Sequence, residues 1–173
     1  MTVEKQVDRV ELVRRAAELV PNLKKRAAET EERRSISQET VDELHAAGIM
    51  RAPQPVRYGG FDIDYGVVLD IAAELGRGCG STAWCYGIWA SHNWVVGMFP
   101  EKAQEEYWAE SKDVLSSTSF NPSKAEVTAA TDGYRLSGRW EFSSGCDYAE
   151  WVMLAGVGPA LGGMLYMLVP SSD

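Results

Sequence analysis

The chain has 173 residues, 45% of them hydrophobic and 10% aromatic, which is enough for one sizeable globular domain or one domain and part of another. Its net charge of −8 argues against a nucleic-acid or anionic-membrane partner, because such binders cluster Lys and Arg. The sequence shows neither a signal-peptide core nor a transmembrane-length apolar run, and its three cysteines lack metal or disulfide spacing. We therefore expect a cytoplasmic protein with free thiols.

The N-terminal part of the chain has helical periodicity. Apolar residues recur at three- and four-residue steps over residues 10–23, where Pro21 is expected to kink or interrupt the helix. A second helix is expected over residues 38–47, capped by Ser35 or Ser37 and followed by Gly48. Prolines and paired glycines then predict a loop over residues 51–64.

Three more helices are predicted before Lys112. They are expected to begin at Asp64, Ser81 and Pro100, which are residues that cap or open helices. The middle one, over residues 82–99, is apolar on nearly every side. Such a helix is expected at the centre of a fold.

After Lys112 the sequence changes to short strand-like segments, with a hairpin signal at Asp132-Gly133. Five strands are predicted, at residues 114–120, 125–131, 134–142, 151–157 and 164–170. The expected class is α+β. It would have a helical domain over residues 1–112 and an antiparallel, barrel-like β domain over residues 113–173 that five strands leave incomplete.

Two glycine-rich segments have part of a dinucleotide-binding pattern. Residues 76–81 follow a helix, whereas that pattern needs a preceding strand. Residues 156–163 follow a strand, but their glycine spacing is wrong and Pro159 intervenes. We interpret these segments as a helix junction and a hairpin loop.

His92 lies on an apolar face of the predicted central helix, together with Cys85, Ile88, Trp89 and Val96. One interpretation is a core histidine that bonds a backbone carbonyl, and the pattern alone favours it. The other is a base that lines an apolar pocket. The second histidine, His45, is expected at a surface or boundary, and neither has the partner residues of a metal site.

Hydroxyl residues cluster at 116–119 and again at Ser143 and Ser144. Each cluster alone is typical of an ordinary strand or turn. On neighbouring strands they would offer several hydrogen bonds to the edge of one planar ligand. Trp84 and Trp140 could cover the face of that ligand, although core packing is the usual role of tryptophan.

Four segments together resemble the acyl-CoA dehydrogenase superfamily, and within it the oxygenase components of two-component flavin-dependent monooxygenases such as 4-hydroxyphenylacetate 3-hydroxylase. They are "LHAAGIMRAPQPVRYGG" (44–60), "AAELGRGCGSTAW" (72–84), "SHNW" (91–94) and "GYRLSGRWEFSSGCDYAEWVML" (133–154). The resemblance implies a helical domain and a β domain followed by a C-terminal helical bundle, which is missing here. It also implies reduced FMN or FAD, O2, an aromatic substrate, a separate flavin reductase and a homo-oligomer, which is a tetramer in the family.

Site residues follow from the resemblance position by position. Ser143 is implied to lie at the flavin N5 edge, and His92 to act as a base on the substrate. The implied cofactor-binding residues are Thr118, Ser119, Phe120, Ser143 and Ser144, and the implied substrate-binding residues are Trp84 and His92. Two alternatives remain open, namely an FAD-dependent acyl-CoA dehydrogenase and a non-catalytic fragment that acts in subunit association. Dehydrogenases commonly have Trp-Ile-Thr-Asn-Gly where this chain has Glu-Phe-Ser-Ser-Gly, which favours the oxygenase branch.

Overall fold

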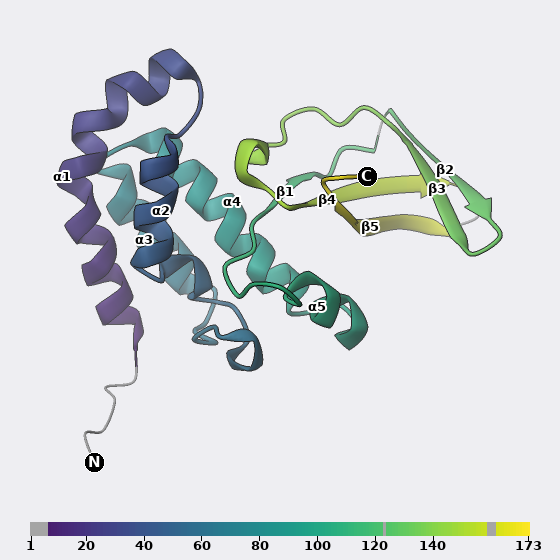
Figure 1. The fold of residues 1–173 in the computed structure, drawn as a ribbon, viewed down its shortest axis with the longest axis horizontal. Helices are drawn as coiled ribbons and strands as arrows, with labels where there is room; N and C mark the ends of the chain where they lie inside the picture. Colours follow the sequence, from purple (N-terminus) through teal and green to yellow (C-terminus); the bar gives the residue numbers. More distant parts are fainter. Residues whose placement is uncertain (1–6, 123, 159–161) are drawn as a thin grey trace. The chain divides into compact units, whose positions relative to one another are not determined.

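A computed structural model describes residues 7–122, 124–158 and 162–173, so Pro159 of the predicted hairpin loop lies outside the described residues. The chain forms two compact units that divide between Asp113 and Val114. The first unit is helical and the second is built mainly from strands (Figure 1). This order of a helical part and then a sheet part is the expected one.

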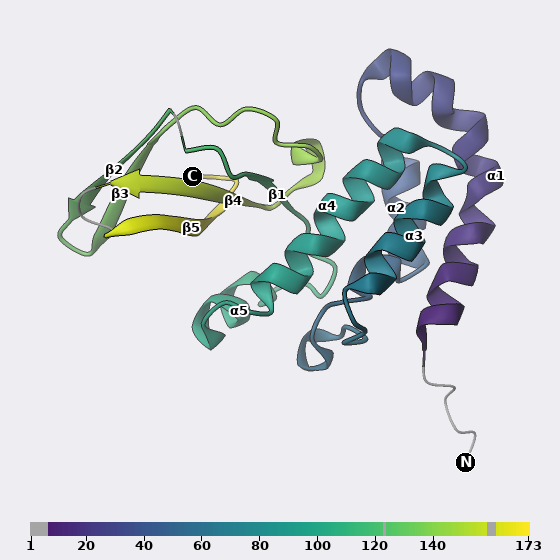
Figure 2. The ribbon, with the colours of Figure 1, turned by 180° about the vertical axis from the view of Figure 1, so that it is seen from behind.

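The helical unit contains α1 (Arg9–Arg33), α2 (Gln38–Ala46), α3 (Gly66–Gly76), α4 (Gly80–Val96) and α5 (Glu101–Tyr107). Two short 3₁₀ helices, η1 (Ile49–Arg51) and η2 (Val56–Tyr58), lie between α2 and α3. Figure 2 shows α3 between α1 and α4, and α3 packs on both of these helices. No helix among the described residues combines the length and the apolar character that crossing a membrane requires.

Helix α1 runs through Pro21 as one helix, so of the two expected effects of Pro21 the interruption is wrong, while the kink stays a prediction. Proline removes one backbone donor, which costs one intrahelical hydrogen bond. The cost is offset by burial of an apolar stripe on both sides of the proline, made of Leu12, Ala16, Val20 and Leu23. Tertiary packing therefore keeps this helix continuous.

The caps of the helices confirm some expected boundaries and correct others. Ser37 is the N-cap of α2, where its side chain accepts a hydrogen bond from the Thr40 amide, and Gly48 follows the helix with φ +72°. Asp64 accepts from the Gly66 amide at 3.0 Å, but Tyr65 occupies the N-cap of α3. Helix α4 starts at Gly80 after Cys79, one residue before the expected Ser81.

Helix α4 supplies much of the core of the helical unit. Tyr86, Trp89 and Ala90 are fully buried, in agreement with the predicted central position. On the predicted apolar face, Trp89, His92 and Val96 are buried, whereas Cys85 and Ile88 are half-buried. The apolar face is thus rotated slightly from the one expected, toward Tyr86 and Ala90.

The β unit contains β1 (Ser116–Ser119), β2 (Ala125–Ala130), β3 (Gly133–Gly138), β4 (Trp151–Gly158) and β5 (Gly163–Pro170). One sheet has the order β1-β4-β5, and β2 and β3 form a separate antiparallel hairpin at the predicted turn. The pair β4–β5 is antiparallel as expected, but β1 and β4 are parallel. A parallel pair needs a long connection, which the β2–β3 hairpin supplies. Among the described residues the two sheets do not close into a barrel.

Strand β3 ends at Gly138, so the strand expected over residues 134–142 is too long. The segment after Gly138 makes different contacts. Trp140 Nε1 donates to the Ala155 carbonyl at 2.9 Å, and the Glu141 carbonyl accepts from Ser119 Oγ at 2.7 Å. Phe142 has φ +64°, a left-handed conformation that no continuous strand accommodates.

Candidate functional site

The structure brings the two predicted hydroxyl clusters together within the β unit. Successive residues of a strand point to opposite faces, so Ser117 and Ser119 share one face of β1. Ser143 Oγ donates to Ser117 Oγ at 3.1 Å, and Ser119 Oγ donates to the Glu141 carbonyl at 2.7 Å. One face of β1 is therefore joined to the segment 141–143 by two hydrogen bonds.

The remaining predicted cofactor residues lie around this cluster. Thr118 Oγ1 donates to the carbonyl of Met153, its register partner on β4, at 2.7 Å. Phe120 is 43% exposed, and the centroid of its ring lies 4.6 Å from the centroid of the Tyr166 ring. Ser144 is half-buried and precedes Gly145, which turns the chain with φ +77°. The exposed ring of Phe120 and the half-buried serines leave polar and aromatic groups accessible to a ligand.

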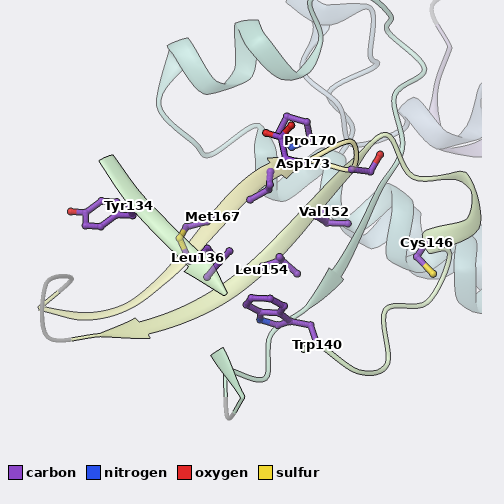
Figure 3. A pocket seen from close by; sticks show the side chains of 11 residues that line it. Tyr134, Leu136, Trp140, Cys146, Val152, Leu154, Met167, Pro170 and Asp173 are labelled. Atoms are coloured by element: carbon purple, nitrogen blue, oxygen red, sulfur yellow. The ribbon is translucent and has the colours of Figure 1, made fainter. Parts of the chain in front are cut away.

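A pocket of about 710 Å³ opens on the β unit (Figure 3). Facing pairs of the β4–β5 ladder, Val152 with Val169 and Leu154 with Met167, line it together with Trp140. Because Ser117 and Ser119 are register partners of Val152 and Leu154, the hydroxyl face of β1 continues the same face of the sheet. The serines thus adjoin an apolar surface with an aromatic ring beside it.

No pattern in the sequence predicts this pocket. The strands β4 and β5 are apolar on both faces, so their residues gave no period-two signal that distinguishes the pocket face from the other. Only the register of β4 with β5 decides that Val152, Leu154, Met167 and Val169 face the same way. Trp140 was the one lining residue with a predicted ligand role.

The other two predicted site residues lie on α4 in the helical unit. His92 is buried, with 3% of its surface exposed, whereas Trp84 is 64% exposed. Tyr86, on the same helix, is fully buried, and this burial raises the pKa of its phenol. The predicted site residues therefore fall into two groups, one in each unit.

Both groups consist of side chains that can recognise an uncharged ligand through hydrogen bonds and apolar contacts. The β unit offers hydroxyls that can donate and accept, with an aromatic and apolar surround. The helical unit offers one buried imidazole, whose ring nitrogens can donate or accept hydrogen bonds. Among residues 7–122, 124–158 and 162–173 there is no group of three or more His, Cys, Asp or Glu arranged to hold a metal ion.

Residues 4–111 match the family model described as "Acyl-CoA dehydrogenase, N-terminal domain". The chain belongs to this family. The match covers more than half of the chain and includes all five helices of the helical unit. The helical unit that the sequence resemblance predicts therefore corresponds to the N-terminal domain of this family.

Similar members of the family include oxygenases. The chain is 36% identical to the FADH(2)-dependent resorcinol hydroxylase, oxygenase component, of Rhizobium sp. (strain MTP-10005), over 95% of this chain and 41% of the relative. It is 37% identical to the flavin-dependent monooxygenase, oxygenase subunit HsaA, of Rhodococcus jostii (strain RHA1), over 80% of this chain and 36% of the relative. The crystal structure of the HsaA monooxygenase from M. tuberculosis superimposes with a TM-score of 0.89 at 31% identity, over 96% of this chain and 46% of that chain. This chain thus spans about two fifths of the length of these curated relatives.

Proposed function

We propose that this chain acts within the oxygenase component of a two-component flavin-dependent monooxygenase that hydroxylates a phenol or another aromatic substrate. The relatives named above are oxygenases of this kind and match 95% and 80% of the chain. The observation that carries the proposal is the hydrogen bond from Ser143 to Ser117, because it places the hydroxyl that the resemblance assigns to the flavin edge beside a strand of further hydroxyls. An association fragment does not require this cluster, whereas a dehydrogenase would also bind a flavin and is distinguished by the oxygenase relatives and by the acyl-CoA test below.

The residues of the β unit fit a flavin. The polar edge of an isoalloxazine alternates donors and acceptors, and hydroxyl groups can meet either. In this proposal Ser143 and Ser144 bond that edge, and Phe120 packs on the ring. Thr118 and Ser119 line the flavin, while the Thr118 hydroxyl ties β1 to β4 and the Ser119 hydroxyl ties β1 to Glu141. Reduced flavin, FAD or FMN, would supply the two electrons that activate O2, so that one oxygen atom of O2 enters the substrate and the other leaves as water. One relative is described as FADH(2)-dependent, which supports FAD.

His92 is the proposed base on the substrate side. A phenolate attacks an electrophilic oxygen better than a phenol does, so a base that accepts the phenol proton speeds the reaction. The buried position of His92 suits this role because few waters compete for its ring nitrogens. Trp84, with its large exposed ring on the same helix, is the proposed aromatic contact for the substrate.

The proposed partners follow from the reaction. A separate reductase would supply the reduced flavin, and O2 and the aromatic compound would be the co-substrates. A homo-oligomer, tetrameric as in the family, would cover exposed apolar side chains of the helical unit such as Leu69 and Met98. A cytoplasmic location suits the free cysteines Cys79, Cys85 and Cys146.

The test uses the full-length protein with a flavin reductase, NADH and a panel of phenols. We expect Ser143→Ala to raise the share of consumed O2 that is released as hydrogen peroxide, and to lower hydroxylated product about tenfold or more. Ser137→Ala, an exposed serine on β3, is the matched control and should leave both quantities unchanged. Oxygen uptake and chromatography of the products measure the two effects.

His92→Ala tests the substrate side. A loss of about a hundredfold in phenol turnover with unchanged flavin affinity is the expected result. Equal turnover in wild type and His92→Ala, or the absence of hydroxylated product from every phenol, would contradict the proposal. Reduction of bound FAD by an acyl-CoA would instead support the dehydrogenase alternative, and no thermal shift with any flavin would support the association fragment.

A further inference from the structure

Both chain neighbours of His92 are hydrogen-bonded to elements outside α4. Ser91 Oγ lies 2.8 Å from the phenol oxygen of Tyr65, at the start of α3, and also donates to the Gly87 carbonyl within α4. Asn93 Nδ2 donates to the Met50 carbonyl in η1 at 3.1 Å. Tyr107 in α5 donates its phenol hydrogen to Asn93 Oδ1 at 3.3 Å. These contacts connect α4 to three other elements of the helical unit.

The hydrogen bonds of Ser91 and Asn93 to other elements set the rotation of α4 about its axis. Successive residues of an α-helix are turned by about 100°, so Ser91, His92 and Asn93 point in three directions with His92 in the middle. A hydrogen bond on each side of His92 resists rotation in both senses. Asn93 and Tyr107 are each 1% exposed, and hydrogen bonds between such buried groups are costly to break.

We propose that Ser91 and Asn93 are positioning residues that orient the His92 imidazole by fixing the rotation of α4. The inference rests on the proposed function, in which His92 is the base for the phenol. Neither residue is placed in contact with substrate or flavin. Their effect reaches the reaction only through His92.

The activity test separates positioning from general loss of structure. In the full-length protein, Asn93→Ala is expected to lower kcat for an ordinary phenol about tenfold or more while KM changes little, because a misplaced base slows proton transfer. A phenol with a pKa below the assay pH arrives already ionised and needs no base. With that substrate the deficit of Asn93→Ala should shrink to less than about threefold, as should the deficit of His92→Ala.

A second measurement does not depend on activity. The chain has two histidines, His45 and His92, so imidazole NMR of histidine-labelled protein has two ring systems, and His45→Gln assigns them. We expect one sharp set of His92 ring signals in the wild type. Asn93→Ala should shift these signals or split them into several, as α4 samples more than one rotation.

Two further variants provide the controls. Asn22→Ala removes a comparable hydrogen bond, from Asn22 Nδ2 to Glu43 Oε1 at 3.0 Å between α1 and α2, and should leave His92 signals and turnover unchanged. If Asn93→Ala does not fold, Tyr107→Phe removes only the phenol hydroxyl and should produce the same changes to a smaller degree. Ser91→Ala tests the other side of the imidazole.

The outcomes are distinguishable. The inference is overturned if the His92 signals of Asn93→Ala match the wild type, or if its deficit is as large with the ionised phenol as with the ordinary one. If His92→Ala keeps full turnover, the proposed function fails, while the NMR comparison still decides whether Asn93 orients the imidazole. If His92→Ala loses turnover and Asn93→Ala does not, the function stands and the positioning role is wrong.

Discussion

At the scale of single residues, Gly60 shows how closely the loop between α2 and α3 is packed. A Cβ atom at this position would lie 2.0 Å from the backbone oxygen of Gln54, and backbone cannot move aside as a flexible side chain can. Gln54 is itself fully buried, and its Nε2 bonds the carbonyls of Tyr58 and Lys112 at 2.7 and 3.0 Å. The loop thus folds around one buried amide, with no room for a side chain at Gly60.

Gly60→Ala is therefore expected to destabilise the protein by roughly 1–3 kcal/mol, because the methyl group forces the backbone of the loop apart. Gly80→Ala is the matched control, since a Cβ at Gly80 meets nothing within 4 Å. Urea denaturation followed by circular dichroism measures both variants. A Gly60→Ala midpoint equal to that of the wild type would mean that the loop can rearrange freely.

The candidate site illustrates what residue patterns can and cannot predict. The hydroxyl residues 116–119 and 143–144 were recognisable as unusual clusters in the sequence. That Ser117 in particular meets Ser143 depends on the course of the segment after Gly138, which is irregular and therefore has no periodicity to interpret. Local sequence predicts the chemical type of a site better than its contacts.

At the scale of elements, helix starts depend on short-range hydrogen bonds. Ser35 and Ser37 were equally plausible caps of α2 from sequence, and the structure selects Ser37, whose side chain accepts from the Thr40 amide. The β-region backbone of Ser37 directs its hydroxyl at that amide. Ser35 Oγ instead donates to the Ile36 carbonyl at 3.4 Å.

Ser37→Ala is expected to cost about 1 kcal/mol of unfolding free energy, because the cap satisfies an amide that α2 leaves without an intrahelical partner. Ser35→Ala, at a half-buried serine that does not cap the helix, should cost less than Ser37→Ala. The comparison of the two denaturation midpoints is the measurement. Equal losses in both variants would show that the cap of α2 contributes nothing specific.

Strand pairing was harder to predict than helix position. The existence of β2, β3, β4 and β5 follows from short apolar or β-branched runs and from the turn at Asp132-Gly133. The parallel pairing of β1 with β4 does not, because it joins residues far apart in the chain and leaves no local mark. Helices satisfy their hydrogen bonds locally, whereas a strand needs a partner that the local sequence does not name.

At the scale of the whole molecule, the chain consists of two units with separate cores. The helical unit buries large side chains from all five of its α-helices, including Leu12, Leu44, Ile71, Trp89 and Tyr107. The β unit buries fewer, chiefly Leu115, Val127 and Met153. Most of the stabilising apolar burial therefore belongs to the helical unit.

A chain that ends at Asp113 is accordingly expected to fold without the β unit. Its far-UV circular dichroism should show a helical protein, and thermal unfolding should be a single cooperative transition, because a unit with its own core unfolds as one. Calorimetry compares its transition with that of the 173-residue chain. Broad, non-cooperative melting would indicate that the helical unit depends on residues 114–173.

The sequence by itself determined the helical and strand content, the central role of α4 and the residue types of the candidate site, since periodicity, caps and composition are local properties. It also carried the family resemblance that the match over residues 4–111 shows. Only the tertiary structure decided that α1 continues through Pro21, that β1 runs parallel to β4, and that Ser117 bonds Ser143. Each of these depends on burial or on a hydrogen-bond partner supplied by a distant segment, and no local pattern encodes the identity of that partner.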